Sequence, residues 1–158
     1  MKAPTSEEPI IRLLPKEKCH TQSIRKIAGI LCYIDRDILI NDLMDAFNEN
    51  ERITAVGVVD SCLKIIGIIV RNEISSLLSR PYGRDVLRKK TAADMCVRAR
   101  RFNIHENIFS VAEEIDEEMK APGISYFLLE DDDGSYRGIF STKEMLIYLS
   151  NLTTQDIA

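Results

Sequence analysis

Ser141, Thr142 and Glu144 are the residues of this sequence whose types and spacing best suit the binding of a ligand. They end a short segment that begins at a glycine and reads Gly138-Ile139-Phe140-Ser141-Thr142-Lys143-Glu144. A glycine lets the backbone approach a ligand closely. Hydroxyl and backbone N–H groups at the start of a helix bind phosphate, and a carboxylate one turn later can accept hydrogen bonds from a ribose diol. The segment therefore has the chemistry to hold a phosphorylated sugar.

The same residues have a second interpretation that needs no ligand. A serine followed three positions later by a glutamate, as with Ser141 and Glu144, forms a capping box at a helix N-terminus. An earlier copy of the segment has Val70 at the hydroxyl position and Glu73 at the acidic position. That copy lacks half of the phosphate chemistry, and its Asn72 is suited to act as a plain N-cap. Both interpretations, ligand site and cap, stay open.

A basic stretch in the middle of the chain is a second feature that favours an anionic ligand. Between residues 80 and 101 only Asp85 and Asp94 oppose a larger basic set, namely Arg80, Arg84, Arg88, Lys89, Lys90, Arg98, Arg100 and Arg101. Focused positive potential of this kind attracts phosphorylated ligands. A solvated surface helix or a contact with an acidic partner domain explains the charges equally well. A nucleic-acid role is disfavoured, because only Tyr82 and Phe102 are interleaved with the basic residues as aromatics.

The overall composition excludes several classes of protein. The chain has 158 residues, 45% of them hydrophobic, and a net charge of −4. These values predict a folded domain rather than a disordered or nucleic-acid-binding chain. There is no apolar run of roughly 18 residues, so no membrane span is expected. Residues 1–9 carry Glu7 and Glu8 rather than a basic cluster before an apolar stretch, so no secretion signal is expected and a cytoplasmic location follows as the default.

Neither a metal site nor catalysis is predicted. The 4 cysteines show no C-x-x-C spacing and there are only 2 histidines, so ligands for a metal are too few and the thiols are expected to be free and reduced. The acidic stretch 130–134 is most simply a solvated hairpin turn. His105 stands beside Glu106 just before a predicted helix, where polar residues act as caps. With no activated nucleophile and no Gly-rich phosphate loop, we expect a protein that is not an enzyme.

The elements that position these residues come in two copies about 70 residues apart. Each copy has a helix with apolar residues at i, i+3, i+4 and i+7, in the first copy with Asp37 as its cap. Two strand-like runs follow, 53–59 with 63–70 in the first copy and 124–129 with 136–140 in the second. With a short leading strand and a closing helix, each unit is strand, helix, strand, strand, helix. One unit of about 60 residues buries too little to be stable alone, so the two are expected to share a core.

The predicted organisation has five parts. The first part, residues 1–30, is a leader followed by a helix. The leader is expected to be flexible or loosely docked to about residue 15, because its prolines break any helix, and the helix is expected over 16–31. They precede a first repeat over 31–79, a linker over 80–99, a second repeat over 100–151 and the start of a connector over 152–158. The fold class expected is α/β (α+β), with two β-α-β-β-α repeats packed sheet to sheet around a pseudo-two-fold axis.

Residues 30–151 resemble a tandem pair of CBS domains, also called a Bateman module. The resemblance rests on the β-α-β-β-α order, the duplication and the Gly138–Glu144 segment, which is similar to the family's Gly-hydrophobic-x-Ser/Thr-x-x-Asp nucleotide motif with a glutamate in place of the aspartate. It implies a non-catalytic regulatory module that forms homodimers and binds AMP, ADP, ATP or S-adenosylmethionine in the clefts between the repeats. The residues it implies as ligand-binding are Glu73, Arg100, Arg101, Tyr126, Ser141, Thr142 and Glu144.

Two flanking segments resemble parts of bacterial signalling proteins. Residues 80–87 resemble the linker of CBS pairs attached to diguanylate cyclases, and residues 152–158 resemble the start of a connector helix that leads into a phosphatase-type output domain. These resemblances imply a sensor fragment that controls an attached or partner enzyme. The alternative is a CBS pair that has lost its ligand and serves as a dimerisation or protein–protein interaction scaffold, and Val70 supports this alternative.

Overall fold

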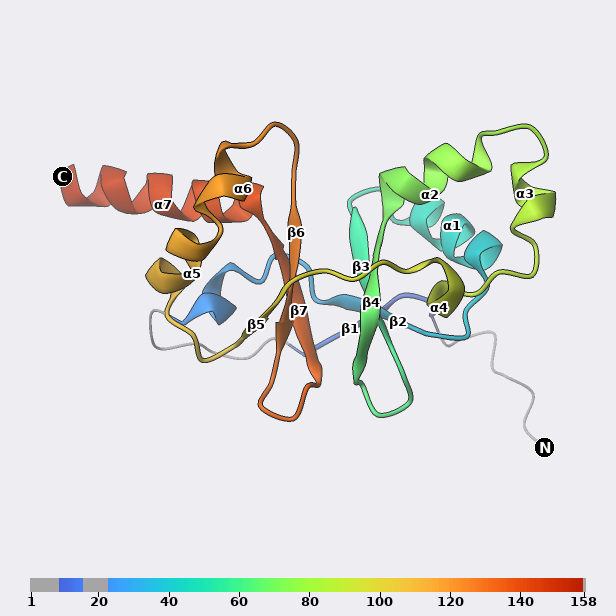
Figure 1. The fold of residues 1–158 in the computed structure, drawn as a ribbon, viewed down its shortest axis with the longest axis horizontal. Helices are drawn as coiled ribbons and strands as arrows, with labels where there is room; N and C mark the ends of the chain where they lie inside the picture. The colour runs from blue at the N-terminus through green and yellow to red at the C-terminus, as the bar shows by residue number, and fades with distance from the viewer. Residues whose placement is uncertain (1–8, 16–22, 158) are drawn as a thin grey trace.

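Strands occupy the centre of the molecule and helices its two ends. The structure is a computed structural model that describes residues 9–15 and 23–157, with side chains up to residue 152. Figure 1 shows two halves side by side, each with its strands toward the middle and its helices toward the outside. Within the described ranges, no helix combines the length and the apolar character that crossing a bilayer requires.

The first half is built on a four-stranded sheet with the order β1-β2-β3-β4. Its β2 and β3 are parallel, so they need a crossover, and α1 supplies it while burying Ile40, Leu43 and Phe47. Its elements are β1 (Arg12–Leu13), β2 (Cys32–Asp35), α1 (Ile40–Glu49), β3 (Ala55–Val59), β4 (Ile65–Val70) and α2 (Arg71–Leu78).

The second half has a three-stranded sheet with the order β5-β6-β7, reached through two short helices. In the second of these helices, α4, Thr91 and Asp94 form a capping box. The helices α3 (Gly83–Val86) and α4 (Ala92–Met95) pack on the first half, where Ala92 and Met95 join its core. The elements of the second half are η1 (Ile24–Ile27), whose two isoleucines lie in its core, β5 (Arg101–Asn103), α5 (Ile108–Glu114), α6 (Asp116–Lys120), β6 (Tyr126–Glu130), β7 (Tyr136–Ser141) and α7 (Thr142–Ile157).

The strand registers confirm the predicted duplication. Ala55 pairs with Val70 across the β3–β4 hairpin, and Tyr126 pairs with Ser141 at the matching position of the β6–β7 hairpin. The register also shifts at the same place in both hairpins, at 58/59 in the first and at 129/130 in the second. A β-bulge repeated in this way indicates one backbone design used twice.

Each half extends a segment into the other. Ile30, which precedes β2, forms an antiparallel bridge with Ile139 of β7. Val97, which precedes β5, forms the corresponding bridge with Ile68 of β4. In each bridge the two residues exchange a pair of backbone hydrogen bonds, with N to O distances between 2.7 and 3.1 Å. The halves are therefore joined by main-chain hydrogen bonds as well as by side-chain packing.

Three apolar clusters form the core, one in each half and one between them. The cluster between the halves, called the seam cluster here, draws side chains from both sheets and contains Leu14, Ala55, Val59, Ile65, Ile68, Leu128, Tyr136 and Ile139. Each Å² of apolar surface that these side chains remove from water stabilises the fold by roughly 25 cal/mol. The α/β (α+β) class and the sheet-to-sheet packing of the two repeats are thus confirmed.

Three local predictions were wrong. Residues 23–31 contain only the 3-10 turn η1 and then extended backbone instead of a helix, while residues 16–22 lie outside the described part of the chain. Asp37 does not cap α1, whose N-cap is Leu39, because its own N–H is held in a turn by Asp35. Asn72 is the second residue of α2 rather than its cap, because β4 runs directly into the helix.

Candidate functional site

Ser141 and Glu144 form a closed capping box where β7 becomes α7. Oε1 of Glu144 accepts hydrogen bonds from the Ser141 N–H at 3.0 Å and from the Ser141 hydroxyl at 2.5 Å. The Glu144 N–H donates in return to Ser141 Oγ at 3.4 Å. Both groups that the sequence offers for a phosphate and a ribose are therefore hydrogen-bonded to each other in this conformation.

Thr142 is fully buried and ties the end of β7 to the start of β6. Its N–H donates to the carbonyl of Ser125 at 3.0 Å, and its hydroxyl accepts from the Ser125 N–H at 3.2 Å. The side chain is only 2% exposed. In this conformation the Thr142 hydroxyl supports the hairpin and does not reach the surface.

The second carboxylate oxygen of Glu144 faces the backbone of Gly29. A Cβ atom added to Gly29 would lie 1.8 Å from Oε2, so only glycine fits beneath this carboxylate. Burial raises the pKa of Glu144 above its ordinary value, and the hydrogen bonds from Ser141 oppose that rise. Gly29 also lines a cavity of about 730 Å³ together with Leu13, Leu14, Pro15, Ala28, Ile30, Leu31, Cys32, Arg52 and Ile53. The backbone of Gly29 therefore lies between the Glu144 carboxylate and this cavity.

The corresponding junction in the first half has the same backbone and different side chains. The Arg71 N–H donates to the Thr54 carbonyl at 2.8 Å, which matches the bond between Thr142 and Ser125. Val70 provides no side-chain cap for α2, and Glu73 in the first turn of that helix is exposed. The carboxylate of Glu73 is thus accessible, while that of Glu144 is held inward.

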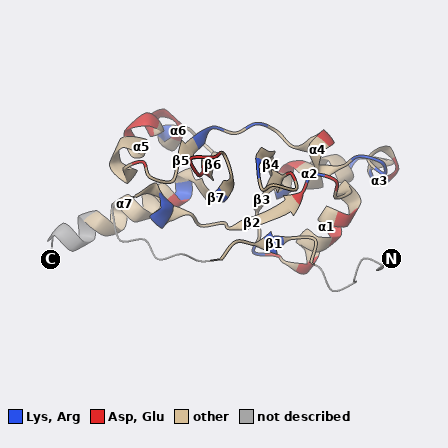
Figure 2. Ribbon diagram, turned by 90° about the horizontal axis from the view of Figure 1, so that it is seen from below, with Lys and Arg blue, Asp and Glu red and all other residues tan. Residues whose placement is uncertain are grey.

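Arg100 and Arg101 point to different parts of the molecule. Arg100 forms an ion pair with Glu114 at 2.7 Å and lies over the ring of Phe102, so it belongs to the surface of the second half. Arg101 lies 3.5 Å from Glu130 and donates across to the Ile65 carbonyl of the first half at 3.3 Å. Figure 2 shows basic colouring on the coil that runs from α4 toward β5.

Arg101 also borders a cavity of about 410 Å³ between the halves. The cavity is lined by Ile65, Ile66, Gly67, Arg98, Ala99, Arg101 and Leu128. The lining thus combines apolar residues with two arginines, Arg98 and Arg101. We call it the arginine cleft, and the 730 Å³ cavity beside Gly29 the glutamate cleft.

Tyr126 contributes a polar contact between the two halves. Its hydroxyl donates to Oγ1 of Thr54 at 3.3 Å. The tyrosine begins β6 and Thr54 directly precedes β3, so the bond joins the starts of these two strands. Together with Arg101, this contact places two of the predicted residues between the halves.

Solved structures of CBS domains share this arrangement. A CBS domain-containing protein from Bacillus anthracis aligns with a TM-score of 0.65 at 11% identity, over 82% of this chain and 93% of that one. The CBS domain of a bacterial CNNM/CorC family Mg²⁺ transporter, in complex with ATP, aligns with a TM-score of 0.60 at 15% identity, over 78% and 84% of the two chains. CbpB in complex with c-di-AMP aligns with a TM-score of 0.56 at 16% identity, over 79% of each.

This chain has the fold of a tandem CBS-domain pair. No protein-family model and no curated protein matches its sequence. The likeness therefore shows the architecture of a CBS pair, and the chemistry has to be argued from the side chains of this chain.

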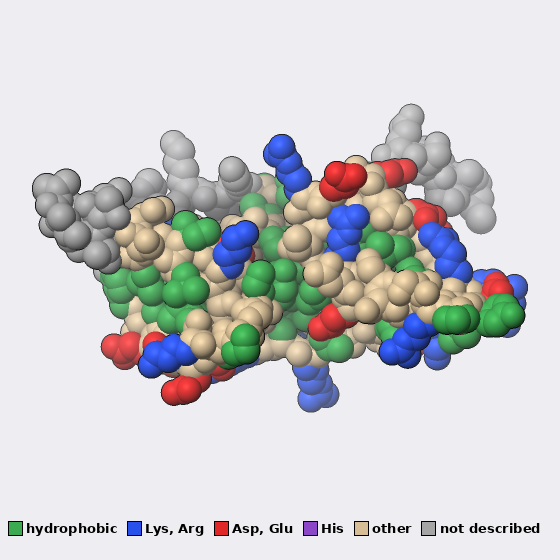
Figure 3. Space-filling view, turned by 90° about the horizontal axis from the view of Figure 1, so that it is seen from above, with side chains coloured by type: hydrophobic (Ala, Val, Ile, Leu, Met, Phe, Trp, Pro, Cys, Tyr) green, Lys and Arg blue, Asp and Glu red, His purple; other side chains and the backbone are tan. Residues whose placement is uncertain are grey.

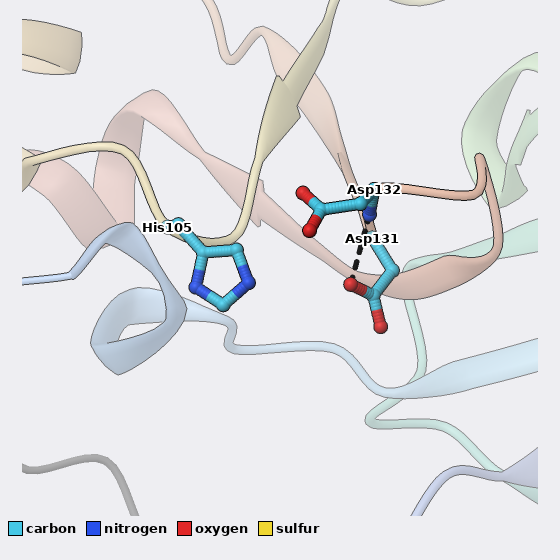
Figure 4. Close-up of side chains that lie close together, drawn as sticks. All are labelled: His105, Asp131 and Asp132. Atoms are coloured by element: carbon cyan, nitrogen blue, oxygen red, sulfur yellow. Dashed lines mark hydrogen bonds between the residues drawn. The ribbon is translucent and has the colours of Figure 1, made fainter.

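One side-chain group on the CBS pair has the composition of a metal site. His105, Asp131 and Asp132 each offer a ligand atom, and these atoms lie within 4.8 Å of one another (Figure 4). However, Arg137 donates two hydrogen bonds to Oδ2 of Asp131, at 3.0 and 2.7 Å, and Asn103 donates to Asp132. Arg137 thus already pairs with the charge of Asp131, Asn103 occupies one oxygen of Asp132, and these two aspartates lie in the connection between β6 and β7.

Four residues that shape the clefts of the CBS pair were not among the predicted site residues. Arg98 was visible in the basic stretch, but nothing in the sequence singled it out from its neighbours. Gly29 and Tyr136 carry no local motif. Leu14 belongs to an apolar run, Ile10 to Leu14, whose periodicity is too short to predict a docking partner.

Proposed function

We propose that this CBS pair is a non-catalytic, cytoplasmic regulatory module that binds an adenine nucleotide or a related phosphorylated ligand between its halves. Ligand binding would then control an attached or partner signalling enzyme. The fold supports the proposal, and two proteins with that fold were solved with ATP and with c-di-AMP bound. Binding would favour one relative position of the halves, because a ligand shifts an equilibrium only through unequal affinity for its two states.

The observation that carries the proposal is the arginine cleft. Its volume of about 410 Å³ lies in the range of small-molecule sites. Of its apolar lining residues, Ile66 and Ala99 are partly exposed and offer a surface to a flat base, while Arg98 and Arg101 offer guanidinium groups to a phosphate. A nucleotide combines these two chemistries in one molecule.

The remaining predicted residues have graded roles in the proposal. Glu73 is the proposed ribose acceptor on the side of the first half, because its carboxylate is exposed. Ser141, Thr142 and Glu144 are the proposed counterpart on the other side, and they would bind only after Glu144 leaves Gly29. Tyr126 is proposed to border the base, and Arg100 to add positive potential without direct contact. Residues 80–99 remain the proposed linker and residues 152–158 the proposed connector to an output domain of phosphatase or diguanylate cyclase type.

A thermal-shift and calorimetric screen tests this function. AMP, ADP, ATP, S-adenosylmethionine and c-di-AMP are added at millimolar concentration, and ligand at about 100 times Kd adds roughly 2.7 kcal/mol of stability. Arg101→Ala should weaken binding of the responding ligand at least about tenfold. Arg84→Ala is the matched control, because Arg84 is exposed, forms an ion pair with Asp45 and does not line the arginine cleft. Equal affinity of both variants, or no response to any ligand, would contradict the proposal.

The scaffold is the second candidate function, and the surface of α7 favours it. Leu146 and Ile147 on this helix are 48% and 51% exposed. Figure 3 shows hydrophobic side chains gathered over the half that carries α7. A homodimer formed through this face would be disrupted by Leu146→Glu, measured by sedimentation. A dimer that responds to Leu146→Glu in a chain that binds no nucleotide would favour the scaffold over the sensor.

A further inference from the structure

The described part of the N-terminal segment, residues 9–15, is integrated into the fold. Its strand β1 pairs antiparallel with β2, with Arg12 opposite Tyr33 and Leu13 opposite Cys32. The Leu14 N–H then donates to the Leu31 carbonyl at 3.0 Å. In Figure 1 the blue trace of these residues crosses the centre of the molecule beside β2. The segment therefore runs along the seam between the halves.

Two adjacent leucines of this segment have opposite environments. Leu13 is 69% exposed, whereas Leu14 is 7% exposed and belongs to the seam cluster. The other members of that cluster come from β3, β4, β6 and β7, so Leu14 packs among side chains of both halves. A side chain from outside the two repeats is thus part of the contact between them.

The same segment borders only one of the two clefts. Leu13, Leu14 and Pro15 line the glutamate cleft, with Gly29 between that cleft and Glu144. The arginine cleft is lined by residues of the two repeats and the coil between them. The clefts are therefore unequal, because one is shared with the N-terminal segment and the other is not.

A second asymmetry accompanies the first. Tyr136 of β7 lies against Gly57 of β3, where a Cβ atom would approach the ring to 2.4 Å. The positions that match them by strand register are Ile65 and Leu128, and both line the arginine cleft. Tyr136 is buried and donates a hydrogen bond from its hydroxyl to the Cys32 carbonyl at 2.7 Å. The large ring thus fills space and braces β2, the strand that carries β1.

We propose that residues 12–14 are a displaceable plug of the glutamate cleft, held by Leu14, which a ligand entering that cleft must release. The plug would make the two clefts bind in sequence, with the arginine cleft filled first and the glutamate cleft only after β1 detaches. The contacts that hold the segment include two ladder positions, the hydrogen bond from Leu14 to Leu31 and the burial of Leu14, and none of them is internal to a repeat, so release requires no unfolding of either repeat. The ligand part of this inference rests on the proposed function.

Thiol labelling tests the plug without any ligand. Cys32 lies opposite Leu13 and lines the glutamate cleft, so it reports detachment of β1. In a background with Cys19→Ser, Cys62→Ser and Cys96→Ser, Leu14→Ala should raise the labelling rate of Cys32 at least about tenfold. Val86→Ala is the control, because Val86 is an exposed residue of α3 with no cross-strand contact to Cys32, so the rate should stay unchanged. Equal rates in the two variants, with both folded by circular dichroism, would overturn the plug.

A reversible clamp tests the link to ligand binding. In the variant Leu13→Cys, the new thiol stands in register with Cys32, so oxidation can join β1 to β2 and mass spectrometry verifies the bond. With ATP as the probe in calorimetry, the oxidised clamp should bind at most one ATP per chain. The reduced clamp and Leu14→Ala should bind a second, or bind at least about fivefold more tightly overall.

The outcomes separate the plug from the proposed function. Two ATP molecules bound to the oxidised clamp, or the same isotherm in all variants, would overturn the plug and leave the function standing. No ATP binding in any variant would count against the proposed function and against ligand-driven release together. The labelling rates would still decide whether Leu14 holds the segment.

Discussion

Ser141 and Glu144 close the junction between β7 and α7 with reciprocal hydrogen bonds, while Val70 and Glu73 leave the matching junction between β4 and α2 uncapped. The backbone is the same in both places, down to the position of the β-bulge. The difference lies entirely in side chains. A duplicated fold therefore does not imply duplicated chemistry, because two residues decide whether a carboxylate faces inward or outward.

The contact between the two sheets also differs between its two matching sides. On one side the ring of Tyr136 lies against Gly57, and on the other Ile65 stands at the position of the tyrosine and Leu128 at that of the glycine. The first pair is tightly packed, and the second lines the arginine cleft. At these matching positions the two sides of a pseudo-symmetric molecule are thus packed differently, with a ring against a glycine on one side and two aliphatic side chains on the other.

The largest expected effect comes from the tight side of the seam. Gly57→Ala would place a Cβ atom 2.4 Å from the ring of Tyr136, which is 1% exposed and cannot move aside. Overpacking of this kind destabilises by about 2–3 kcal/mol, measured by urea unfolding. Adding Tyr136→Ile should recover at least about 1 kcal/mol in a double-mutant cycle, because the ring is then replaced by the isoleucine that stands at the matching position, Ile65. Additive effects would show that the ring and the glycine are not in conflict.

The next effect concerns the capping box. Ser141→Ala removes the hydroxyl that both donates to Glu144 and accepts from its N–H, so the free energy of unfolding should fall by about 1 kcal/mol. Ser76→Ala is the control, because Ser76 is exposed on α2, away from a cap. It should stay within about 0.5 kcal/mol of the parent. Similar losses in both variants would mean that the box contributes no stability.

The buried carboxylate should also make stability depend on pH. The pKa of Glu144 is raised by burial, so the folded state binds a proton more readily than the unfolded state. Its contribution is therefore fully present below the unfolded pKa and is lost as the pH rises through the folded pKa. Glu144→Gln removes the ionisation, so the variant should gain stability relative to the parent between acidic and neutral pH. Thermal melts across this range measure the difference.

Glu73→Gln is the matched control for the pH experiment. It removes a carboxylate at the corresponding position of the first half, where the side chain is exposed. Subtracting its profile corrects for the loss of one surface charge. A parallel change in the two variants would contradict the assignment of the pH dependence to the closed junction.

The architecture was predictable because it depends on patterns that recur. The β-branched runs around Val58 and Ile68 and the helix periodicity from Ile40 to Phe47 each have a counterpart about 70 residues later. Hydrophobic periodicity and repetition are properties of the sequence itself. The two halves and their shared core followed from them.

The clefts were less predictable because they depend on contacts between distant residues. Ser141 and Glu144 were correctly placed at a helix start, yet the sequence does not show that Gly29 lies beneath the carboxylate. The burial of Leu14 depends on the space left between two sheets, which no local pattern describes. The missing caps at Asp37 and Asn72 have the same cause, since strand pairing set the helix boundaries instead of local propensity.

The smallest expected effects separate the two neighbouring arginines. Arg100→Ala breaks an exposed ion pair with Glu114 inside the second half, and Arg101→Ala breaks contacts that reach Glu130 and the Ile65 carbonyl across the seam. Each should lower the free energy of unfolding by no more than about 0.5 kcal/mol. High salt should abolish the Arg100 effect, since exposed charges are screened, and should leave part of the Arg101 effect, since a hydrogen bond to a carbonyl is screened less. Urea unfolding at low and high salt measures both. Identical salt dependence would contradict the proposal that the hydrogen bond from Arg101 to the Ile65 carbonyl helps to join the halves beside the arginine cleft.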